Sequence, residues 1–334
     1  MRPSTLSPTT RREALRLALA GVAGLAWPRL ALAQGDESFD GFLDGVRREA
    51  AAQGVRTATL DAALNGLQPV ERVLALDTHQ PETTVTFADY IDRSVNPKRI
   101  EAGRTRLHDN QALLAEIGAR YNVQPRFIVA LWGLETDFGA FTGGFEIVPA
   151  LATLAWKSSR PALFRAELIA ALRILDRSGL RTDQLKGSWA GAMGQTQFMP
   201  SSYLKYAVDY RGKGRADIWE DRADVFASIA NYLAREGWNG AYSWGREVRL
   251  PPGLDQGLLG GKVLKTVAQW QALGVRRSDG GELPRAALEA GLVQPGGPQG
   301  PSLMTYGNYR VIMKWNHSNY FATSVSYLAD RIAV

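Results

Sequence analysis

Residues 125–139 read PRFIVALWGLETDFG and are the most informative stretch of the chain. Pro125 suits the first turn of a helix, and Gly139 is typical of the position just past a helix end. The residues from Phe127 to Leu134 between them are almost wholly apolar. This composition predicts a helix that is buried on most of its sides.

Glu135 is the residue of this helix whose chemistry conflicts with its position. It follows Leu131 by four residues and Ile128 by seven, so it falls on the same side of the helix as both. A carboxylate on an apolar face is costly when ionised, so we expect its pKa to be raised. A carboxylic acid that stays protonated near neutral pH can give a proton to the leaving oxygen of a glycosidic bond. The alternative is a structural Glu135 paired with an arginine or a backbone donor.

Asp137 does not supply a second catalytic carboxylate next to Glu135. Two residues further along the predicted helix, it points roughly 200° away around the helix axis. Retaining glycosidases with two carboxylates hold them about 5 to 5.5 Å apart across the bond. The local sequence therefore offers one acid rather than a pair.

The first 33 residues have the pattern of an export signal. Arg11 and Arg12 precede an apolar run over 17–27, and a small-x-small cleavage site ends the segment at 31–33. The arginine pair resembles a twin-arginine signal, with the general secretion route as the alternative. An amphipathic first helix is the other interpretation. Export predicts a periplasmic protein.

Composition narrows the classes of partner. The whole chain carries a net charge of +6, but five arginines and one glutamate lie in 1–33, which leaves +2 for the rest. This balance does not favour a nucleic-acid partner. The chain has no cysteine, so it has neither disulfides nor a cysteine for lipid attachment. We expect a monomer without a membrane anchor.

Helical periodicity dominates the first two thirds of the chain. Apolar residues recur at helical spacing over 37–120, with a break at Gln80-Pro81. Further helices are predicted at 150–156, 162–175 and 223–237.

The texture changes at about Trp244. Short alternating pieces at 247–250 and 309–312, separated by glycine and proline pairs, predict a small β-rich lobe. A last helix is predicted behind the capping candidates Asn316 and Ser318. We therefore divide the chain into a signal peptide, a helical lobe with the core, the β-rich lobe and a final helix, at 1–33, 34–243, 244–313 and 314–334.

Three stretches carry a resemblance to a known family. ALWGLETDFG at 130–139, GSWAGAMGQTQFMPSSY at 187–203 and KWNHSNYF at 314–321 resemble the membrane-bound lytic transglycosylase B family. Their order and spacing agree with that family, and the resemblance covers essentially all of the chain after residue 33. A nearly unbroken match over 187–203 is far more specific than a short motif.

The resemblance implies a mainly α (α+β) fold. The family has a lysozyme-like helical core with an N-terminal helical lobe and a small β-rich lobe before the last helix. Glu135 matches its single catalytic acid/base. Implied substrate-binding residues in the cleft are Tyr90, Ser188, Gln197, Tyr232 and Asn316. Trp315 is a further candidate, as an aromatic face for sugars.

The resemblance also implies a reaction on the glycan strands of peptidoglycan. Glu135 protonates the leaving oxygen, the N-acetyl group of the muramic acid sugar acts as internal nucleophile, and the 6-hydroxyl of the same sugar then attacks. The product is a 1,6-anhydromuramic acid end. A lysozyme-like hydrolase and a non-catalytic peptidoglycan-binding scaffold remain alternatives, and cell-wall assembly proteins are candidate partners.

Residues 209–220, DYRGKGRADIWE, have the spacing of an EF-hand loop, which the family often carries. Four positions hold expected residues, namely Asp209, Gly214, Asp217 and Glu220. Positions three and five should offer oxygen ligands but hold Arg211 and Lys213, which would repel calcium. We therefore expect internal salt bridges in this loop and neither a metal nor another cofactor.

Overall fold

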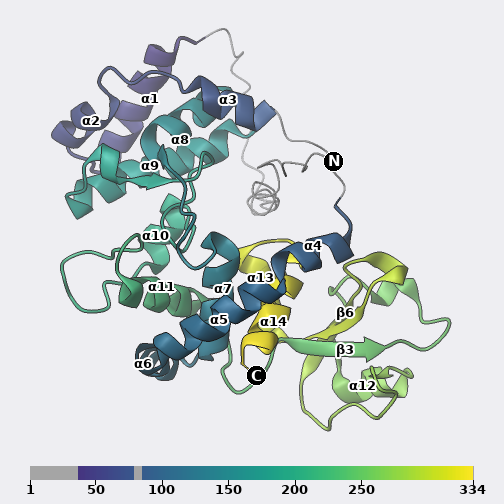
Figure 1. The fold of residues 1–334 in the computed structure, drawn as a ribbon. Helices are drawn as coiled ribbons and strands as arrows, with labels where there is room; N and C mark the ends of the chain where they lie inside the picture. Colours follow the sequence, from purple (N-terminus) through teal and green to yellow (C-terminus); the bar gives the residue numbers. More distant parts are fainter. Residues whose placement is uncertain (1–36, 79–84, 334) are drawn as a thin grey trace, which may run out of the picture. The chain divides into compact units, whose positions relative to one another are not determined.

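The structure is a computed structural model that describes residues 37–78 and 85–333. The predicted signal peptide at 1–33 and the predicted break at Gln80-Pro81 lie outside these residues. The described chain forms two compact units (Figure 1). The first unit takes residues 85–135 and 232–333, and the second unit takes 37–78 and 136–231.

Helices form the larger part of the first unit. They are α4 (Phe87–Ser94), α5 (Pro97–Asp109), α6 (Gln111–Tyr121), α7 (Pro125–Thr136), α12 (Val267–Ala272), α13 (Gly307–Trp315) and α14 (Asn319–Ile332). Helices α4, α5 and α13 pack against α14. The buried face of α14 includes Phe321, Val325, Leu328 and Ile332, which confirms the helix predicted from their spacing.

Helix α7 is the buried helix predicted from residues 125–139. Every residue from Phe127 to Trp132 is at most 2% exposed, and Pro125 opens the helix. The helix ends at Thr136 because Asp137 and Phe138 adopt φ angles of 52° and 60°, in the left-handed region. The expectation that Asp137 continues the helix is therefore wrong.

The β-rich lobe predicted before the last helix is present in the first unit. Its strands are β3 (Gly245–Arg249), β4 (Lys265–Thr266), β5 (Arg276–Arg277), β6 (Glu289–Val293) and β7 (Ser302–Thr305). They form one sheet in the order β4-β6-β7-β3-β5, and all pairs are antiparallel. Trp270 of α12, Leu292 and Met304 are at most 1% exposed in a cluster of their own. The short 3-10 helices of this lobe are η3 (Gln256–Leu258) and η4 (Gly297–Gln299).

The prediction of a strand at 309–312 is wrong, because this segment lies inside α13. Tyr309 and Ile312 are both buried and stand three residues apart, a spacing that fits one face of a helix. A segment of four residues, three of them apolar, cannot distinguish the 3.6-residue period of a helix from the two-residue period of a strand.

The second unit is also mainly helical (Figure 1). Its elements are α1 (Phe39–Ala52), α2 (Thr57–Leu64), α3 (Glu71–Thr78), β1 (Phe145–Glu146), α8 (Ile147–Lys157), α9 (Pro161–Ser178), η2 (Thr182–Gln184), β2 (Lys186–Gly187), α10 (Pro200–Tyr206) and α11 (Arg222–Arg235), whose last turn belongs to the first unit. The three helices predicted between 150 and 237 are thus confirmed. Helices α1, α2, α8 and α10 all pack on α9. Buried Glu167 of α9 accepts hydrogen bonds from the backbone N–H and hydroxyl of Ser201 at 2.9 and 2.7 Å.

The cap of the last helix gives a first testable prediction. The Ser318 hydroxyl accepts a hydrogen bond from the N–H of Phe321 at the start of α14. Ser318→Ala should lower the free energy of unfolding by about 1 kcal/mol in urea denaturation, because this N–H then loses its partner. The matched control is Ser278→Ala at an exposed position, which should leave it unchanged. Equal stability of both variants would contradict the cap.

Candidate active site

Glu135 sits in the last turn of α7 and is partly buried. Its carboxylate oxygen Oε1 accepts a hydrogen bond of 2.6 Å from the indole Nε1 of Trp315, the last residue of α13. The partner that the structure gives Glu135 is therefore a neutral indole, not the arginine or backbone donor of the alternative interpretation.

The surroundings of Glu135 favour its protonated form. Burial raises the pKa of Glu135 from 4.5 to about 7, and the hydrogen bond from Trp315 partly offsets this rise. The cause is loss of hydration of the ionised carboxylate. Near neutral pH both the protonated and the ionised form of Glu135 are therefore accessible. A group that first donates and then accepts a proton needs both forms.

Tyr232 packs edge to face against the indole of Trp315. The two rings meet edge to face with centroids 4.6 Å apart, and Tyr232 is 7% exposed. This geometry is a preferred one for aromatic pairs. Tyr232 therefore fixes the ring that donates to Glu135.

Tyr90 of α4 completes the aromatic surroundings of the acid. Its ring packs edge to face with Tyr320 at 5.5 Å, and Tyr320 also meets Phe87 at 5.2 Å. Burial and, after it, the negative charge of Glu135 raise the pKa of Tyr90 to about 12. Tyr90 therefore keeps its phenolic proton and remains a hydrogen-bond donor at neutral pH.

Asn316 ends α13 directly after Trp315. Its side chain is buried, at 2% residue exposure, and its Oδ1 has no hydrogen-bond partner within the described chain. A buried polar atom without a partner is costly, so each one asks for an explanation. Within the described residues the cost of this oxygen is not offset by a hydrogen bond.

Ser188 and Gln197 belong to the second unit, and Glu135 belongs to the first. The Ser188 hydroxyl accepts a hydrogen bond from the N–H of Ala192 at 3.0 Å. Gln197 has a left-handed φ of 50°, and its amide Nε2 donates to Thr142 O at 3.1 Å and to Gly194 O at 2.8 Å. Such a conformation is uncommon outside glycine and persists only where the surroundings hold it.

Sequence reasoning missed Gln195 and Thr136, which support the backbone directly after Glu135. The Thr136 hydroxyl donates to Gln195 O at 3.1 Å and accepts from Gly139 N–H at 3.0 Å. Gly139 has a φ of 86°, and a Cβ there would collide with Gln195 Oε1. The only signal in the sequence was the place of Gln195 inside 187–203.

The fold is mainly helical with a small antiparallel sheet and holds a partly buried acid, and it has the lysozyme-like class of its solved neighbours. Similar proteins also identify its family. The model of the Transglycosylase SLT domain family matches residues 38–330. Membrane-bound lytic murein transglycosylase B of Escherichia coli is 31% identical over 302 residues, which cover 82% of this chain and 78% of that protein.

Two solved structures extend this likeness to three dimensions. SltB3 of Pseudomonas aeruginosa in complex with NAG-anhNAM-pentapeptide is 40% identical with a TM-score of 0.85, covering 89% of this chain and 80% of that one. The lytic transglycosylase Slt35 of Escherichia coli in complex with calcium is 28% identical with a TM-score of 0.75, covering 87% and 92%. The chain therefore belongs to the Transglycosylase SLT domain family, and it is a lytic murein transglycosylase.

Proposed function

We propose that this enzyme cleaves the β-1,4 bond between N-acetylmuramic acid and N-acetylglucosamine and leaves 1,6-anhydromuramic acid ends, with Glu135 as its single acid/base. The observation that carries the proposal is the partly buried Glu135 with a pKa of about 7 and an indole N–H on one oxygen. One carboxyl group that exchanges its proton near neutral pH can serve both halves of such a reaction.

In the first half, protonated Glu135 gives its proton to the glycosidic oxygen as the bond to the anomeric carbon breaks. The carbonyl oxygen of the sugar's own N-acetyl group bonds to that carbon and takes the place of a second carboxylate. The Trp315 N–H, 2.6 Å from Oε1, then stabilises the carboxylate that remains.

In the second half, the Glu135 carboxylate accepts the proton of the 6-hydroxyl on the same sugar. The hydroxyl oxygen bonds to the anomeric carbon, the N-acetyl oxygen leaves, and Glu135 is protonated again. An intramolecular attack of this kind gains from its high effective concentration, provided that water is kept away. The aromatic rings of Tyr90, Tyr232 and Trp315 give the acid apolar neighbours suited to that task.

We assign substrate contacts to Tyr90, Ser188, Gln197, Tyr232, Trp315 and Asn316. The unpartnered Oδ1 of Asn316 supports its assignment within the first unit, and the strained backbone of Gln197 supports its own. The relative solved with NAG-anhNAM-pentapeptide supports peptidoglycan glycan strands as the substrate.

The setting of the enzyme is part of the proposal. We place it in the periplasm, exported by a signal at 1–33 and acting as a monomer on the wall, where cell-wall assembly proteins are candidate partners. No helix within 37–78 or 85–333 is long and apolar enough to cross a membrane. The segments 34–243, 244–313 and 314–334 remain our proposed divisions of the exported chain.

The test is mass spectrometry of purified peptidoglycan after digestion by the protein. Fragments that end in 1,6-anhydromuramic acid are expected. Reducing ends, which are one water heavier, would make the enzyme a hydrolase. The absence of any fragments would favour a scaffold function.

The Trp315 hydrogen bond predicts a shift in pH dependence. Trp315→Phe keeps an aromatic ring but removes the N–H that stabilises ionised Glu135, so the pKa of Glu135 should rise above about 7. Because the first half needs the protonated acid, the alkaline limb of the kcat/KM profile should move to higher pH. The control is Trp156→Phe, which loses an indole hydrogen bond to Glu37 O in the second unit. An unmoved limb in Trp315→Phe would contradict the role of this bond.

A further inference from the structure

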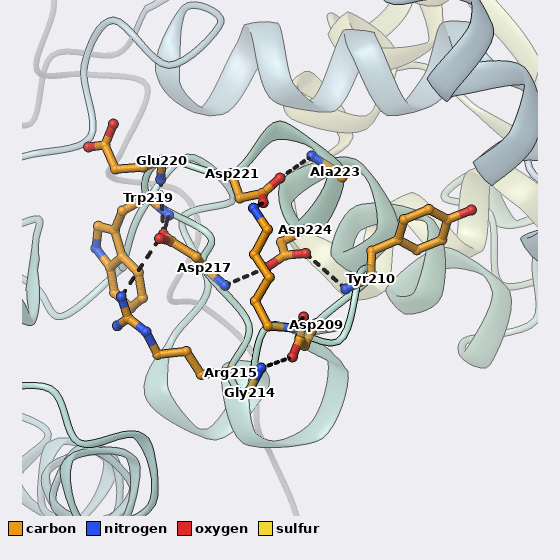
Figure 2. Close-up of polar contacts among 11 residues, drawn as sticks. Asp209, Tyr210, Gly214, Arg215, Asp217, Trp219, Glu220, Asp221, Ala223 and Asp224 are labelled. Atoms are coloured by element: carbon orange, nitrogen blue, oxygen red, sulfur yellow. Dashed lines mark hydrogen bonds and ion pairs between the residues drawn. The ribbon is translucent and has the colours of Figure 1, made fainter.

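The loop at residues 209–220 has EF-hand spacing, but its carboxylates already accept hydrogen bonds from the chain itself (Figure 2). Asp209 accepts the backbone N–H of Lys213 at 2.8 Å on one oxygen and that of Gly214 at 2.6 Å on the other. Asp217 Oδ1 accepts the N–H groups of Trp219 and Glu220, both at 3.0 Å. Both carboxylates are therefore held by hydrogen bonds in the positions where calcium ligands would stand.

A lysine of the loop pairs with the carboxylate that directly follows the loop. Lys213, at the fifth position, places its ammonium Nζ 2.6 Å from Oδ2 of Asp221, and the other oxygen of Asp221 accepts the N–H of Ala223. The hydrogen bond from Lys213 holds the pKa of Asp221 below its usual range. Asp221 stays ionised and joins the loop to the start of α11.

The carboxylate of Asp224 in α11 accepts two backbone hydrogen bonds from the loop. Asp224 is 1% exposed, and its two oxygens accept the N–H groups of Tyr210 at 2.8 Å and Asp217 at 2.8 Å (Figure 2). These bonds join the second and the ninth position of the loop to α11. Its backbone is thus closed by hydrogen bonds without a metal at its centre.

The remaining charges of the loop disfavour a divalent cation. A hollow of about 530 Å³ at this surface is lined by Arg211, Lys213, Arg215, Asp217, Glu220, Asp221 and Arg222. Four cations thus face three carboxylates. Glu220, which would close a calcium site with both oxygens, is exposed, and its carboxylate points away from Asp209 in Figure 2.

We propose that the Lys213 ammonium is the built-in structural cation of this loop, and that the loop folds without calcium and does not bind it. The ligands of an EF-hand do not fit here, because positions three and five carry Arg211 and Lys213. This chain therefore differs from the relative that was solved in complex with calcium.

The loop also supports the backbone that follows Glu135 in the chain. Gln195 donates from its backbone N–H to Ile218 O at 2.8 Å and from its amide Nε2 to Trp219 O at 2.5 Å. Gln195 O in turn accepts from the Thr136 hydroxyl at 3.1 Å. Because the loop folds without calcium, its hydrogen bonds with Gln195 do not depend on the calcium concentration.

The first test compares the full protein with and without calcium. The Tm of the wild type should be the same in chelator and in millimolar calcium chloride, and calorimetric titration should show no binding. Lys213→Met should lower the Tm by about 1–2 °C, the size expected for one exposed ion pair in a chain of this length. The control is Lys262→Met at an exposed lysine, which should leave it unchanged. A rise in the wild-type Tm with calcium, or equal Tm values for the two methionine variants, would overturn the proposal.

The second test restores the missing ligands. Arg211→Asp combined with Lys213→Asp gives aspartates at positions one, three and five, followed by Gly214, as in a calcium-binding loop. This variant should have a lower Tm than the wild type in chelator, and calcium should raise it by several degrees, since ligands that bind only the folded state stabilise it. A variant that matches the wild-type Tm in chelator would show that Lys213 has no structural role.

Discussion

Glu135→Gln should lower kcat for peptidoglycan lysis by about 10²–10⁴-fold, the usual contribution of a positioned general acid/base. Glutamine keeps the size of the side chain and can still accept the Trp315 hydrogen bond through its amide oxygen. It has no proton to give to the leaving oxygen and cannot take one from the 6-hydroxyl. Binding of glycan strands should therefore persist while cleavage is lost.

The matched control for this activity prediction is Glu282→Gln, the same substitution at an exposed position of the β-rich lobe. It should leave kcat unchanged. If Glu135→Gln kept kcat within about tenfold of the wild type, Glu135 would not be the acid/base. An inactive Glu135→Gln protein that fully replaced the enzyme in cells would instead favour the scaffold function.

Glu135→Gln should also raise the free energy of unfolding at neutral and alkaline pH. The pKa of Glu135 is about 7 in the folded protein against 4.5 for the free group, so the folded state disfavours the ionised carboxylate. The wild type therefore loses stability relative to the variant as pH rises from about 4.5 to about 7, where the unfolded chain already carries the charge. Above that window the advantage of Glu135→Gln should reach about 3 kcal/mol.

Urea denaturation of the wild type, Glu135→Gln and Glu282→Gln between pH 4.5 and pH 8 measures this difference. Glu135→Gln should match the wild type at the acidic end and exceed it increasingly up to the alkaline end. Glu282→Gln should show no such trend. A constant difference across the range would mean that Glu135 ionises as easily in the folded protein as in the unfolded chain.

The loss of activity and the gain of stability expected for Glu135→Gln have the same physical cause. The surroundings that keep Glu135 protonated near pH 7 are those that make its charge costly in the folded state. The enzyme thus carries less stability than the same chain with glutamine at this position. Losses of this kind are common where activity needs a destabilised group.

Local pattern predicted much of the fold. The apolar run of α7, the spacing of Phe321, Val325 and Leu328, and the Ser318 cap are all properties of a few neighbouring residues, and the structure confirms each of them. The segment at 309–312 is too short to reveal its helical period, so its alternation of apolar and polar residues wrongly predicts a strand. The left-handed turn at Asp137 and Phe138 gave no signal either, since neither residue is a glycine.

The candidate site shows the same division between local and long-range information. The raised pKa of Glu135 followed from its place on an apolar helix face, and the structure confirms its direction. Its partner Trp315 lies 180 residues further along the chain, so no spacing rule could have paired them without the resemblance. The connection from Gln195 to the loop at 209–220 depends on backbone carbonyls, which carry no sequence signature at all.

In the proposed reaction, the sugar's own 6-hydroxyl, and not water, attacks the anomeric carbon after Glu135 has protonated the leaving oxygen. Digestion of purified peptidoglycan in water enriched in heavy oxygen tests it most directly, with Glu135→Gln as the inactive control. The new muramic acid ends should contain no heavy oxygen and should be one water lighter than reducing ends. Heavy oxygen at the new ends would show that water attacks the anomeric carbon, and would contradict it.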